Sequence, residues 1–297
     1  MRIAFVFPGQ GSQSVGMLSG FAGNETVAGV MARADEALGF SLTGLIAEGP
    51  AVTLSLTVNT QPAMLASSVA FYEAWLAAGG RTPEMMAGHS LGEYSALCAA
   101  GAMSLETAVR LVRFRAEAMQ SAVPVGVGGM AAVIGLADDD VEAAVAEARE
   151  TGRVEAVNFN APGQVVIAGE KAAVARAIEL PGSAPFHSSL MQPAADKLAA
   201  RLAETEIQVP AIPVIANIDV EVHETPDAIR EALARQAAGA VQWVRTIERM
   251  KAAGITDIVE CGPGKVLTGL LRRTAPEING HNIFDAASLA AVLEKLN

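Results

Sequence analysis

Short apolar runs and longer amphipathic segments alternate along this chain of 297 residues. The runs have the length of buried strands and lie at residues 3–7, 85–87, 212–218 and 255–260. The segments between them repeat apolar residues at helical spacing. This spacing predicts helices over residues 27–38, 65–77, 105–120, 193–204, 225–238, 243–253 and 266–273. Strands that alternate with helices favour an α/β protein built on a mostly parallel sheet with helices on both faces.

The pattern changes in the middle of the chain. A Gly-rich, linker-like stretch at residues 123–129 precedes shorter elements in the order strand, helix, strand, strand, helix. These elements are predicted at residues 130–134, 138–150, 154–159, 164–168 and 171–179. The order is typical of a ferredoxin-like unit, whose last strand is missing unless residues 180–186 supply it. We therefore predict a large unit from residues 1–125 and 188–297, interrupted by a small unit at residues 126–187.

A serine stands where an apolar run meets a helix. Residues 88–92 read Gly-His-Ser-Leu-Gly, the G-x-S-x-G pattern of a nucleophile elbow, in which a sharp turn raises the serine hydroxyl above the sheet. Glycine is needed at 88 and 92 because a β-carbon at either place would crowd the crossing backbones. The alternative is a buried structural serine in a Gly-rich turn. The apolar run before it and the small-residue helix after it favour Ser90 as a nucleophile.

A nucleophilic serine needs a general base, and histidine is the usual one near neutral pH. The chain has four histidines. His89 is adjacent to Ser90, so its side chain should point away from the hydroxyl. His223 and His281 lie among polar residues and are expected in surface loops. His187 lies where the small unit rejoins the large one, a common place for a cleft, and by elimination it is the predicted base.

The predicted helix at residues 105–120 carries an arginine on its apolar face. Apolar residues recur along this helix at helical spacing, and Arg115 falls on the same stripe between Val112 and Met119. An arginine on an apolar face is rarely buried unpaired. Its guanidinium either reaches out to solvent, pairs with a protein carboxylate or binds an anionic ligand, and the pattern leaves these three open.

Three other polar positions are candidates for a site. Residues 8–13, Pro-Gly-Gln-Gly-Ser-Gln, lack the Lys-Ser/Thr of a P-loop, but a Gly-rich loop can present backbone N–H groups to an anion. Gln61 precedes Pro62 at the start of a predicted helix, where a surface cap and a role in a site fit the pattern equally well. Asn160 begins a turn at residues 160–163 and, with Gln61, is a candidate for substrate binding.

Composition narrows the class of protein. Hydrophobic residues make up 51% of the chain, which favours a well-buried core over disorder. The net charge of −11 argues against nucleic-acid binding, because a phosphate backbone is bound by a basic face. Cys98 and Cys261 are too few for a disulfide framework and lack metal-ligand spacing, so we expect buried thiols and no metal site. No stretch is apolar enough for a membrane span and the start is not a signal peptide, which predicts a cytoplasmic protein.

Five motifs stand in a specific order along nearly the whole chain. They are residues 8–13, residues 88–93 (Gly-His-Ser-Leu-Gly-Glu), Arg115 with Met119 and Gln120, residues 186–188 (Phe-His-Ser) and residues 262–265 (Gly-Pro-Gly-Lys). Together they resemble the malonyl-CoA:acyl carrier protein transacylase family of acyltransferases. The resemblance implies an α/β-hydrolase-like large subdomain with a mostly parallel sheet, interrupted by a small ferredoxin-like subdomain.

The resemblance also implies an activity and residue roles. Ser90 is acylated, His187 is the base, Arg115 binds the malonyl carboxylate, and the backbone N–H groups of Gln10 and Leu91 form the oxyanion hole. The implied reaction carries a malonyl group from malonyl-CoA through malonyl-serine to the phosphopantetheine thiol of acyl carrier protein, for fatty acid synthesis, by a monomer without cofactor. No Asp occupies an obvious triad place, so a backbone carbonyl near residues 260–262 is predicted to orient the base.

One stretch departs from the family's pattern. A longer helix, a turn and a full strand usually separate the region of Gly169 from the Phe-His motif, whereas here residues 172–178 lead almost directly into 179–181. Either the small subdomain is truncated or a segment is missing from the sequence. The departure leaves the last strand of that subdomain open, but not the order of the motifs.

Other functions fit parts of the pattern. A related acyltransferase of a polyketide pathway, or one that uses methylmalonyl groups, would carry the same motifs, and a free-standing chain with its own start favours the fatty-acid role. A serine esterase or thioesterase would need no buried cation, so Arg115 counts against it. A non-catalytic scaffold for carrier proteins would need neither Ser90 nor His187.

Docking of an acidic carrier protein requires a basic patch on a chain of net negative charge. Basic residues near the C-terminal motifs are candidates, although each could equally lie on a solvated helix face. They are Arg245, Arg249, Lys265, Arg272 and Arg273.

Overall fold

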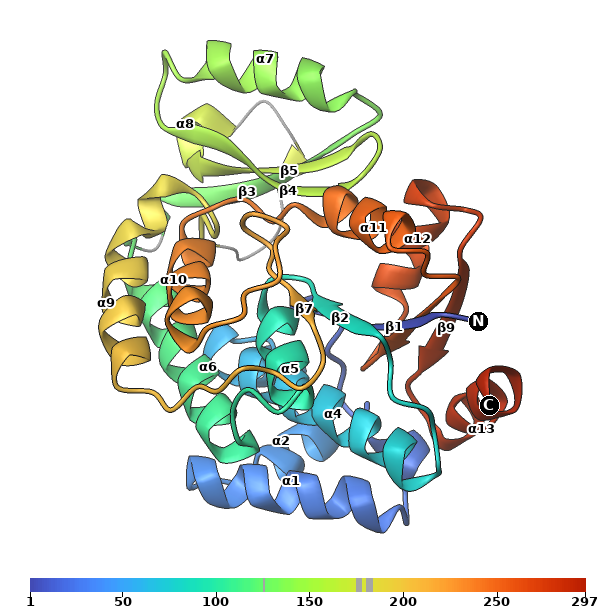
Figure 1. The fold of residues 1–297 in the computed structure, drawn as a ribbon. Coiled ribbons are helices and arrows are strands. Elements are labelled where there is room, and N and C mark those ends of the chain that lie inside the picture. The colour runs from blue at the N-terminus through green and yellow to red at the C-terminus, as the bar shows by residue number, and fades with distance from the viewer. Residues whose placement is uncertain (125, 175–177, 180–183) are drawn as a thin grey trace.

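The computed structural model describes residues 1–124, 126–174, 178–179 and 184–297, and these residues form two sheets (Figure 1). The larger sheet is parallel, in the order β7-β2-β1-β8-β9. Its strands are β1 (Ile3–Phe7), β2 (Met85–Gly88), β7 (Val214–Ile215), β8 (Asp257–Cys261) and β9 (Asn279–Ile283). The predicted strand at residues 212–218 is thus confirmed only at residues 214–215.

Strand β9 was not predicted, because its sequence Asn-Gly-His-Asn-Ile has one apolar residue and β9 is an edge strand. The expectation that His281 lies in a surface loop is therefore wrong. The imidazole of His281 contacts the Asp257 carboxylate at 2.9 Å across the β8–β9 pair. Helix α13 (Ala286–Leu296), which follows β9, was also missed.

Helices cover both faces of the larger sheet, as strand periodicity requires. Alternate residues of β1 point to opposite faces, so Phe5 packs with α4 and α5 while Val6 packs with α11 and α12. The helices on the Phe5 side are α1 (Glu25–Leu38), α2 (Leu42–Glu48), α3 (Ala51–Leu54), α4 (Thr57–Ala77), α5 (Leu91–Ala99), α6 (Leu105–Ser121), α9 (Gln192–Ala203), α10 (Pro226–Ala237) and the C-terminal α13. On the Val6 side are α11 (Trp243–Ala252) and α12 (Val266–Thr274).

Helix α4 begins eight residues before the predicted helix, at Thr57 rather than residue 65. Polar residues near its start made that turn look like a loop, yet Thr60 and Gln61 are fully buried. The hydroxyl of Thr60 donates to the carbonyl of Leu54 at 2.6 Å, which satisfies it inside the core. Tertiary packing has therefore overridden the local polar pattern.

The second sheet is antiparallel, in the order β4-β5-β3-β6. It consists of β3 (Gly128–Ile134), β4 (Val154–Ala161), β5 (Gln164–Glu170) and β6 (Ile178–Glu179), with α7 (Asp138–Ala148) and α8 (Lys171–Val174). This is the ferredoxin-like order, so the predicted fold class is confirmed: a mostly parallel α/β subdomain with a small ferredoxin-like one. The boundaries at residues 125/126 and 187/188 stay a prediction, and residue 125 lies outside the described part.

The last strand of the small sheet comes earlier than predicted. β6 pairs with β3 through Ile178 and Glu179, so the predicted helix at 171–179 is wrong at its last two residues, while α8 is described over Lys171–Val174 and residues 175–177 lie outside the described part. Residues 180–183 of the alternative strand at 180–186 lie outside the described residues. The edge of β3 accounts for the strand at residues 178–179, because unpaired backbone groups at a strand edge favour strand pairing there over helix.

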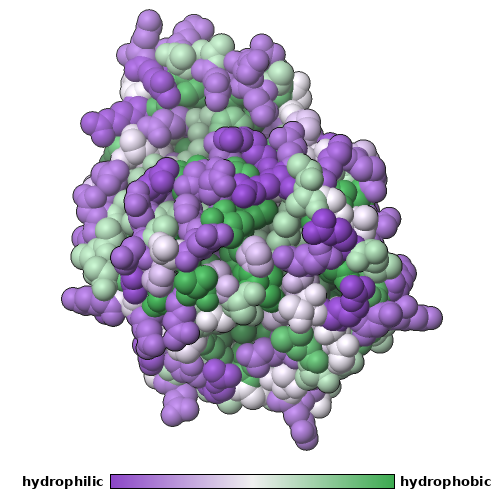
Figure 2. Space-filling model, in the orientation of Figure 1, coloured by the Kyte–Doolittle hydropathy of each residue, from purple (hydrophilic) through white to green (hydrophobic). Residues whose placement is uncertain are grey.

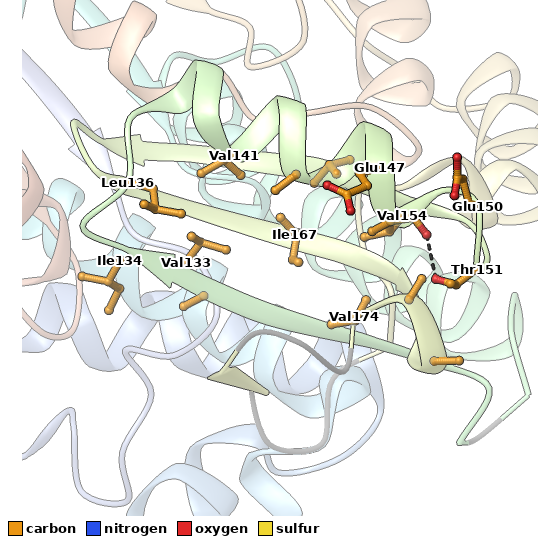
Figure 3. A pocket seen from close by; sticks show the side chains of 16 residues that line it. Val133, Ile134, Leu136, Val141, Glu147, Glu150, Thr151, Val154, Ile167 and Val174 are labelled. Atoms are coloured by element: carbon orange, nitrogen blue, oxygen red, sulfur yellow. Dashed lines mark hydrogen bonds between the residues drawn. The ribbon is translucent and has the colours of Figure 1, made fainter.

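Helix α7 and the described part of α8 lie on the outer face of the small sheet, away from the large subdomain (Figure 1). A cavity of about 810 Å³ lies beside them (Figure 3). Its lining is mostly apolar, and Ile134 at its rim is 63% exposed. Within the described residues, helices thus cover this sheet less completely than the larger one.

Strand β4 joins the two subdomains. The N–H of Val241 donates to the carbonyl of Val157 at 2.8 Å, and the N–H of Phe159 donates back to the carbonyl of Val241 at 3.0 Å. The guanidinium of Arg273 on α12 donates to the Gln164 side chain at 2.7 Å. These contacts hold the inner end of the small sheet against α11 and α12.

Hydrophilic residues predominate on the face shown in Figure 2, with hydrophobic residues visible in smaller areas between them. Among the described residues, no helix has the length and apolar character needed to cross a membrane.

Candidate active site

The Gly-His-Ser-Leu-Gly motif forms a sharp turn between β2, which ends at Gly88, and α5, which begins at Leu91. Ser90 at the turn has φ 52° and ψ −107°, a backbone conformation that residues other than glycine rarely adopt. A β-carbon on Gly88 would lie 1.9 Å from the Gly92 carbonyl, and one on Gly92 would lie 2.0 Å from the Phe7 carbonyl oxygen. The prediction that both glycines permit crossing backbones is confirmed.

Two side chains, one from the turn after β7 and one from α10, hold the strained backbone of Ser90. Its N–H donates to Oδ1 of Asn217 at 2.7 Å, and its carbonyl accepts from Nε2 of Gln236 at 2.9 Å. Nδ2 of Asn217 also donates to the carbonyl of Gly88 at 2.7 Å. Strained conformations persist only where the surroundings fix them in this way.

The hydroxyl of Ser90 contacts the buried imidazole of His187. Oγ of Ser90 lies 2.7 Å from Nε2 of His187. Nδ1 of His187 lies 2.8 Å from the backbone carbonyl of Gln236, which can only accept, so Nδ1 carries the hydrogen. Nε2 is then the acceptor that faces the serine hydroxyl.

The predicted orienting carbonyl near residues 260–262 is therefore wrong in position, although the orienting group is a backbone carbonyl. Gln236 lies in the last turn of α10, where carbonyls have no partner inside the helix. The carboxylate of Glu260 instead accepts from the first N–H groups of α12, at Leu267 (3.0 Å) and Thr268 (2.8 Å). The orienting carbonyl of Gln236 lies 49 residues from His187 along the chain, and no local sequence pattern marks it for this role.

The environment of His187 keeps its imidazole neutral. Burial, and next the positive charge of Arg115, lower the pKa of His187 to about 3. The partial negative charge at the end of α10 opposes this shift through the Gln236 carbonyl. At neutral pH the imidazole is thus free to accept a proton.

Arg115 is 1% exposed, and its guanidinium is held by neutral groups. Nη1 donates to Oε1 of Gln61 at 2.9 Å, and Nη2 donates to Oε1 of Gln236 at 3.0 Å. Nη2 also lies 3.3 Å from Oγ of Ser90.

Two of the three alternatives for Arg115 can now be set aside. Its burial excludes a guanidinium that reaches solvent. Within the described residues no carboxylate forms an ion pair with it, and its Nε has no hydrogen-bond partner. A buried cation with neutral partners, an unused Nε donor and Nη2 at 3.3 Å from Oγ of Ser90 is suited to receiving an anion.

Gln61 links Arg115 to the loop after β1. It is fully buried inside α4, so the surface-cap alternative is wrong. Its Oε1 accepts from Arg115, and its Nε2 donates to Oε1 of Gln10 at 3.2 Å. Polar side chains from α4, α6 and the loop at residues 8–13 thus meet at one place.

The loop at residues 8–13 and the elbow leave the sheet at the same end. β1 and β2 are parallel neighbours, with Phe7 opposite Gly88. A β-carbon on Gly9 would lie 2.7 Å from the carbonyl oxygen of His89, so the two turns pack directly together. Leu91 is the first residue of α5, where the backbone N–H has no partner inside the helix.

His89 points away from Ser90, as expected. Its Nε2 lies 2.7 Å from Oδ1 of Asn160, and its ring lies 5.5 Å from that of Trp243. Asn160 belongs to β4, not to a turn, so a small-subdomain strand reaches the elbow here. A cavity of about 170 Å³ opens at this junction, lined by Gln10, Ser12, His89, Asn158, Asn160 and Gln164 with apolar residues of α12.

Three residues of the site were not predicted, namely Glu93, Asn217 and Gln236. Glu93 was within a quoted motif, but as the residue after the elbow it carried no separate signal. Asn217 follows a strand of two residues, and Gln236 lies in α10 among residues that pack on the core. A fully buried glutamine on the inner face of a predicted helix is the one pattern that could have indicated Gln236.

The described residues contain no group of three or more His, Cys, Asp or Glu side chains placed to hold a metal ion.

A serine at a strand-to-helix elbow, with a neutral imidazole at its hydroxyl, is the arrangement of enzymes that form acyl-serine intermediates. The chain belongs to the acyl transferase family: residues 4–294 match the family model described as "Acyl transferase domain".

Relatives and solved structures are similar to this chain over 99% of its length. The sequence is 49% identical to the malonyl CoA-acyl carrier protein transacylase of Escherichia coli (strain K12), over 99% of each chain. The acyl-carrier-protein S-malonyltransferase of Burkholderia pseudomallei 1710b is 55% identical, with a TM-score of 0.98 over 99% of this chain and 100% of that chain. A type II PKS acyl-carrier protein in complex with its malonyl-transacylase gives 44% identity and a TM-score of 0.97, over 99% of this chain and 100% of that chain.

Proposed function

We propose that this protein transfers a malonyl group from malonyl-CoA to the phosphopantetheine thiol of acyl carrier protein, for fatty acid synthesis. The observation that carries the proposal is the buried guanidinium of Arg115, 3.3 Å from Oγ of Ser90. A cation at that distance from the nucleophile suits an acyl group that bears its own carboxylate. The relatives named above are a malonyl CoA-acyl carrier protein transacylase and an acyl-carrier-protein S-malonyltransferase. Each matches this chain over 99% or more of its own length, which supports this substrate.

In the first step Ser90 is acylated. Oγ of Ser90 attacks the thioester carbonyl of malonyl-CoA while its proton passes to Nε2 of His187. The C–S bond then breaks, and the CoA thiolate leaves as a thiol with the proton from His187. The 2.7 Å contact and the fixed tautomer of His187 support this direction of proton transfer.

In the second step the acyl group moves to the carrier. The phosphopantetheine thiol gives its proton to His187 and attacks the ester carbonyl of malonyl-Ser90. Oγ of Ser90 leaves and takes the proton back, which regenerates the enzyme. The cavity beside the elbow supports entry of the pantetheine arm, because polar and apolar residues both line it and Gln10 and His89, from the two loops at the site, are among them.

The backbone N–H groups of Gln10 and Leu91 are proposed to stabilise the oxyanion of each tetrahedral intermediate. Their packing at the same end of the sheet supports this, as does the position of Leu91 directly after the nucleophile. One such donor contributes roughly 3 kcal/mol to the stabilisation of the transition state.

Arg115 is proposed to select the malonyl group and to tune the base. A malonyl carboxylate would pair with its guanidinium, whereas an acetyl group would leave the buried cation without an anion. The same carboxylate would offset the positive charge that lowers the pKa of His187. His187 would then become a stronger base when the correct substrate is bound.

The remaining expectations about the protein's setting stay predictions. They are a malonyl-CoA and carrier-protein substrate pair with no further cofactor, a monomer, and the cytoplasm. The division at residues 1–125, 126–187 and 188–297 is likewise retained as a proposal. A relative solved with an acyl carrier protein supports the carrier as partner. Asn160 is proposed to contact the pantetheine arm, because it lines the cavity at the elbow.

Acylation without the carrier tests the proposed function. The protein is mixed with malonyl-CoA or with acetyl-CoA, and intact mass and peptide maps are recorded at short times. Malonyl-CoA should give one adduct, on Ser90, and acetyl-CoA far less. Ser90→Ala is the control and should give no adduct.

Rival functions predict other products. Rapid release of malonate without an adduct would identify a thioesterase, and no reaction with either thioester would indicate a scaffold. An equally abundant acetyl adduct would contradict the role proposed for Arg115 while leaving Ser90 as the nucleophile.

A further inference from the structure

Glu93 is a buried residue in the same turn of chain as Ser90, and its carboxylate takes no part in the reaction steps proposed above. It lies in the first turn of α5, three residues after Ser90, and is 2% exposed. Its Oε2 accepts from the backbone N–H of Asn217 at 2.9 Å and from Nε2 of Gln236 at 2.8 Å. Both partners also hold the backbone of Ser90.

Gln236 contacts four residues of the site, namely His187, Arg115, Ser90 and Glu93. Its backbone carbonyl orients His187, its Oε1 accepts from Arg115, and its Nε2 donates to the carbonyl of Ser90. An amide that flipped would turn its NH₂ group towards the donors of Arg115 and its oxygen towards the carbonyl of Ser90. The second donor contact, to Oε2 of Glu93, fixes the amide in the one orientation that satisfies all partners.

Resting on the proposed malonyl transfer, we infer that Glu93 is a positioning residue for that reaction. Its Oε2 holds Asn217 and Gln236 together, and through them it fixes the strained Ser90 peptide and the guanidinium that receives the malonyl carboxylate. The role is that of a hydrogen-bond acceptor with the correct reach, and it does not require a negative charge. Buried amides of this kind are costly to leave without partners.

The electrostatic surroundings fit an acceptor that need not be ionised. Burial raises the pKa of Glu93 to about 7, while the bonds from Asn217 and Gln236 and the charge of Arg115 oppose the shift. Near neutral pH the carboxyl is thus present in both forms. Oε2 can accept the same two hydrogen bonds in either form, provided that any proton lies on the other oxygen.

Two conservative variants separate reach from charge. Glu93→Gln keeps the length and an acceptor oxygen but removes the charge, whereas Glu93→Asp keeps the charge but is one methylene too short to meet Asn217 and Gln236 together. Single-turnover acylation is measured over a range of malonyl-CoA and acetyl-CoA concentrations, so that substrate binding and the acylation rate are obtained separately. Rates are normalised to the amount of Ser90 that can be acylated. Ser95→Ala, on the same helix, is the matched control, since Ser95 is buried without a hydrogen-bond partner among the described residues.

We expect Glu93→Asp to lower the malonyl-over-acetyl preference roughly tenfold and to slow acylation, while Glu93→Gln stays within about threefold of wild type. If Glu93 served only as a counter-charge to Arg115, Glu93→Gln would be the more impaired variant and Glu93→Asp the less impaired one. Glu93→Asp with unchanged preference, or Glu93→Gln as impaired as Glu93→Asp, would overturn the inference. If the wild type itself formed no malonyl-Ser90, the proposed function would fail instead, so the two failures are distinguishable.

Discussion

Two side chains converge on one hydroxyl oxygen at Ser90, an imidazole nitrogen at 2.7 Å and a guanidinium nitrogen at 3.3 Å. The first removes a proton, and the second sits where a carboxylate on the acyl group would arrive. Their proximity has an electrostatic consequence, because a fixed cation disfavours an imidazolium beside it. The substrate's own charge would relieve that effect.

Replacing Arg115 by alanine should remove the preference for malonyl. We expect Arg115→Ala to retain some acylation of Ser90 but to lose roughly 10- to 100-fold of the malonyl-over-acetyl ratio, since a hydrogen-bonded charge pair is lost. Arg113→Ala is the control, because Arg113 is half-buried on the same helix and pairs with Glu117 at 2.9 Å. Unchanged preference in Arg115→Ala would remove Arg115 from this role.

The protonation of His187 can be followed by NMR of its imidazole. Because burial and Arg115 hold its pKa at about 3, the ring should stay neutral from about pH 8 down to about pH 5. In Arg115→Met the pKa should rise, since the second cause of the depression is removed, although burial keeps it below the usual 6.5. A wild-type titration midpoint near the usual 6.5 would contradict the buried, cation-flanked site.

At the scale of elements, the elbow depends on two close backbone crossings. Gly92→Ala would force its β-carbon to within 2.0 Å of the Phe7 carbonyl oxygen, so β1 and α5 would have to separate. We expect a loss of about 3 kcal/mol or more in the free energy of unfolding, measured by denaturant titration.

A second helical glycine provides the matched control for that substitution. Gly29 lies inside α1, and a β-carbon added there would meet no atom within 4 Å, so Gly29→Ala should stabilise by roughly 0.5–1 kcal/mol. Equal effects of the two substitutions would show that the crossing at Gly92 is not tight.

Elements with a strong periodic pattern were predictable, and those defined by distant partners were not. The helix that carries Arg115 was predicted within a residue, because its apolar stripe and the cap at Ser104 are local signals. β9 and β6 were missed because each is an edge strand of the described sheets, selected by pairing with a neighbour. The start of α4 was missed because buried polar residues there resemble a loop.

The same distinction holds for the site. Ser90 could be found because the elbow is a contiguous motif, and His187 because few histidines compete with it. The role of Gln236 in orienting His187 could not be found, since the group that does so is a backbone carbonyl, which every residue has; only a glutamine on the inner face of a predicted helix could have indicated its side chain. The roles of Arg115, Gln10 and Leu91 came from resemblance, and the pattern alone had left Arg115 open.

At the scale of the whole molecule, the site lies where the two subdomains meet, and a buried neutral histidine makes the stability of the fold depend on pH. His187 binds its proton less readily in the folded chain, with a pKa of about 3, than in the unfolded chain, with a pKa near 6.5. Its contribution is therefore fully present above pH 6.5 and is lost as pH falls towards 3.

Acid unfolding of a variant without this histidine measures the contribution. Relative to His187→Gln, the wild type should lose roughly 1.4 kcal/mol of unfolding free energy for each pH unit between about pH 6 and about pH 4. The comparison is made by denaturant titration at several pH values. A constant difference between the two proteins over that range would mean that His187 titrates alike in the folded and unfolded chains.

In the proposed reaction malonyl passes from Ser90 to a thiol, and a chase experiment tests this transfer most directly. Malonyl-Ser90 protein is prepared with labelled malonyl-CoA, freed of CoA, and mixed with pantetheine or with phosphopantetheinylated acyl carrier protein. We predict that the label moves to the thiol much faster than it appears as free malonate in water alone. Release as malonate at the same rate with and without thiol would contradict the claim.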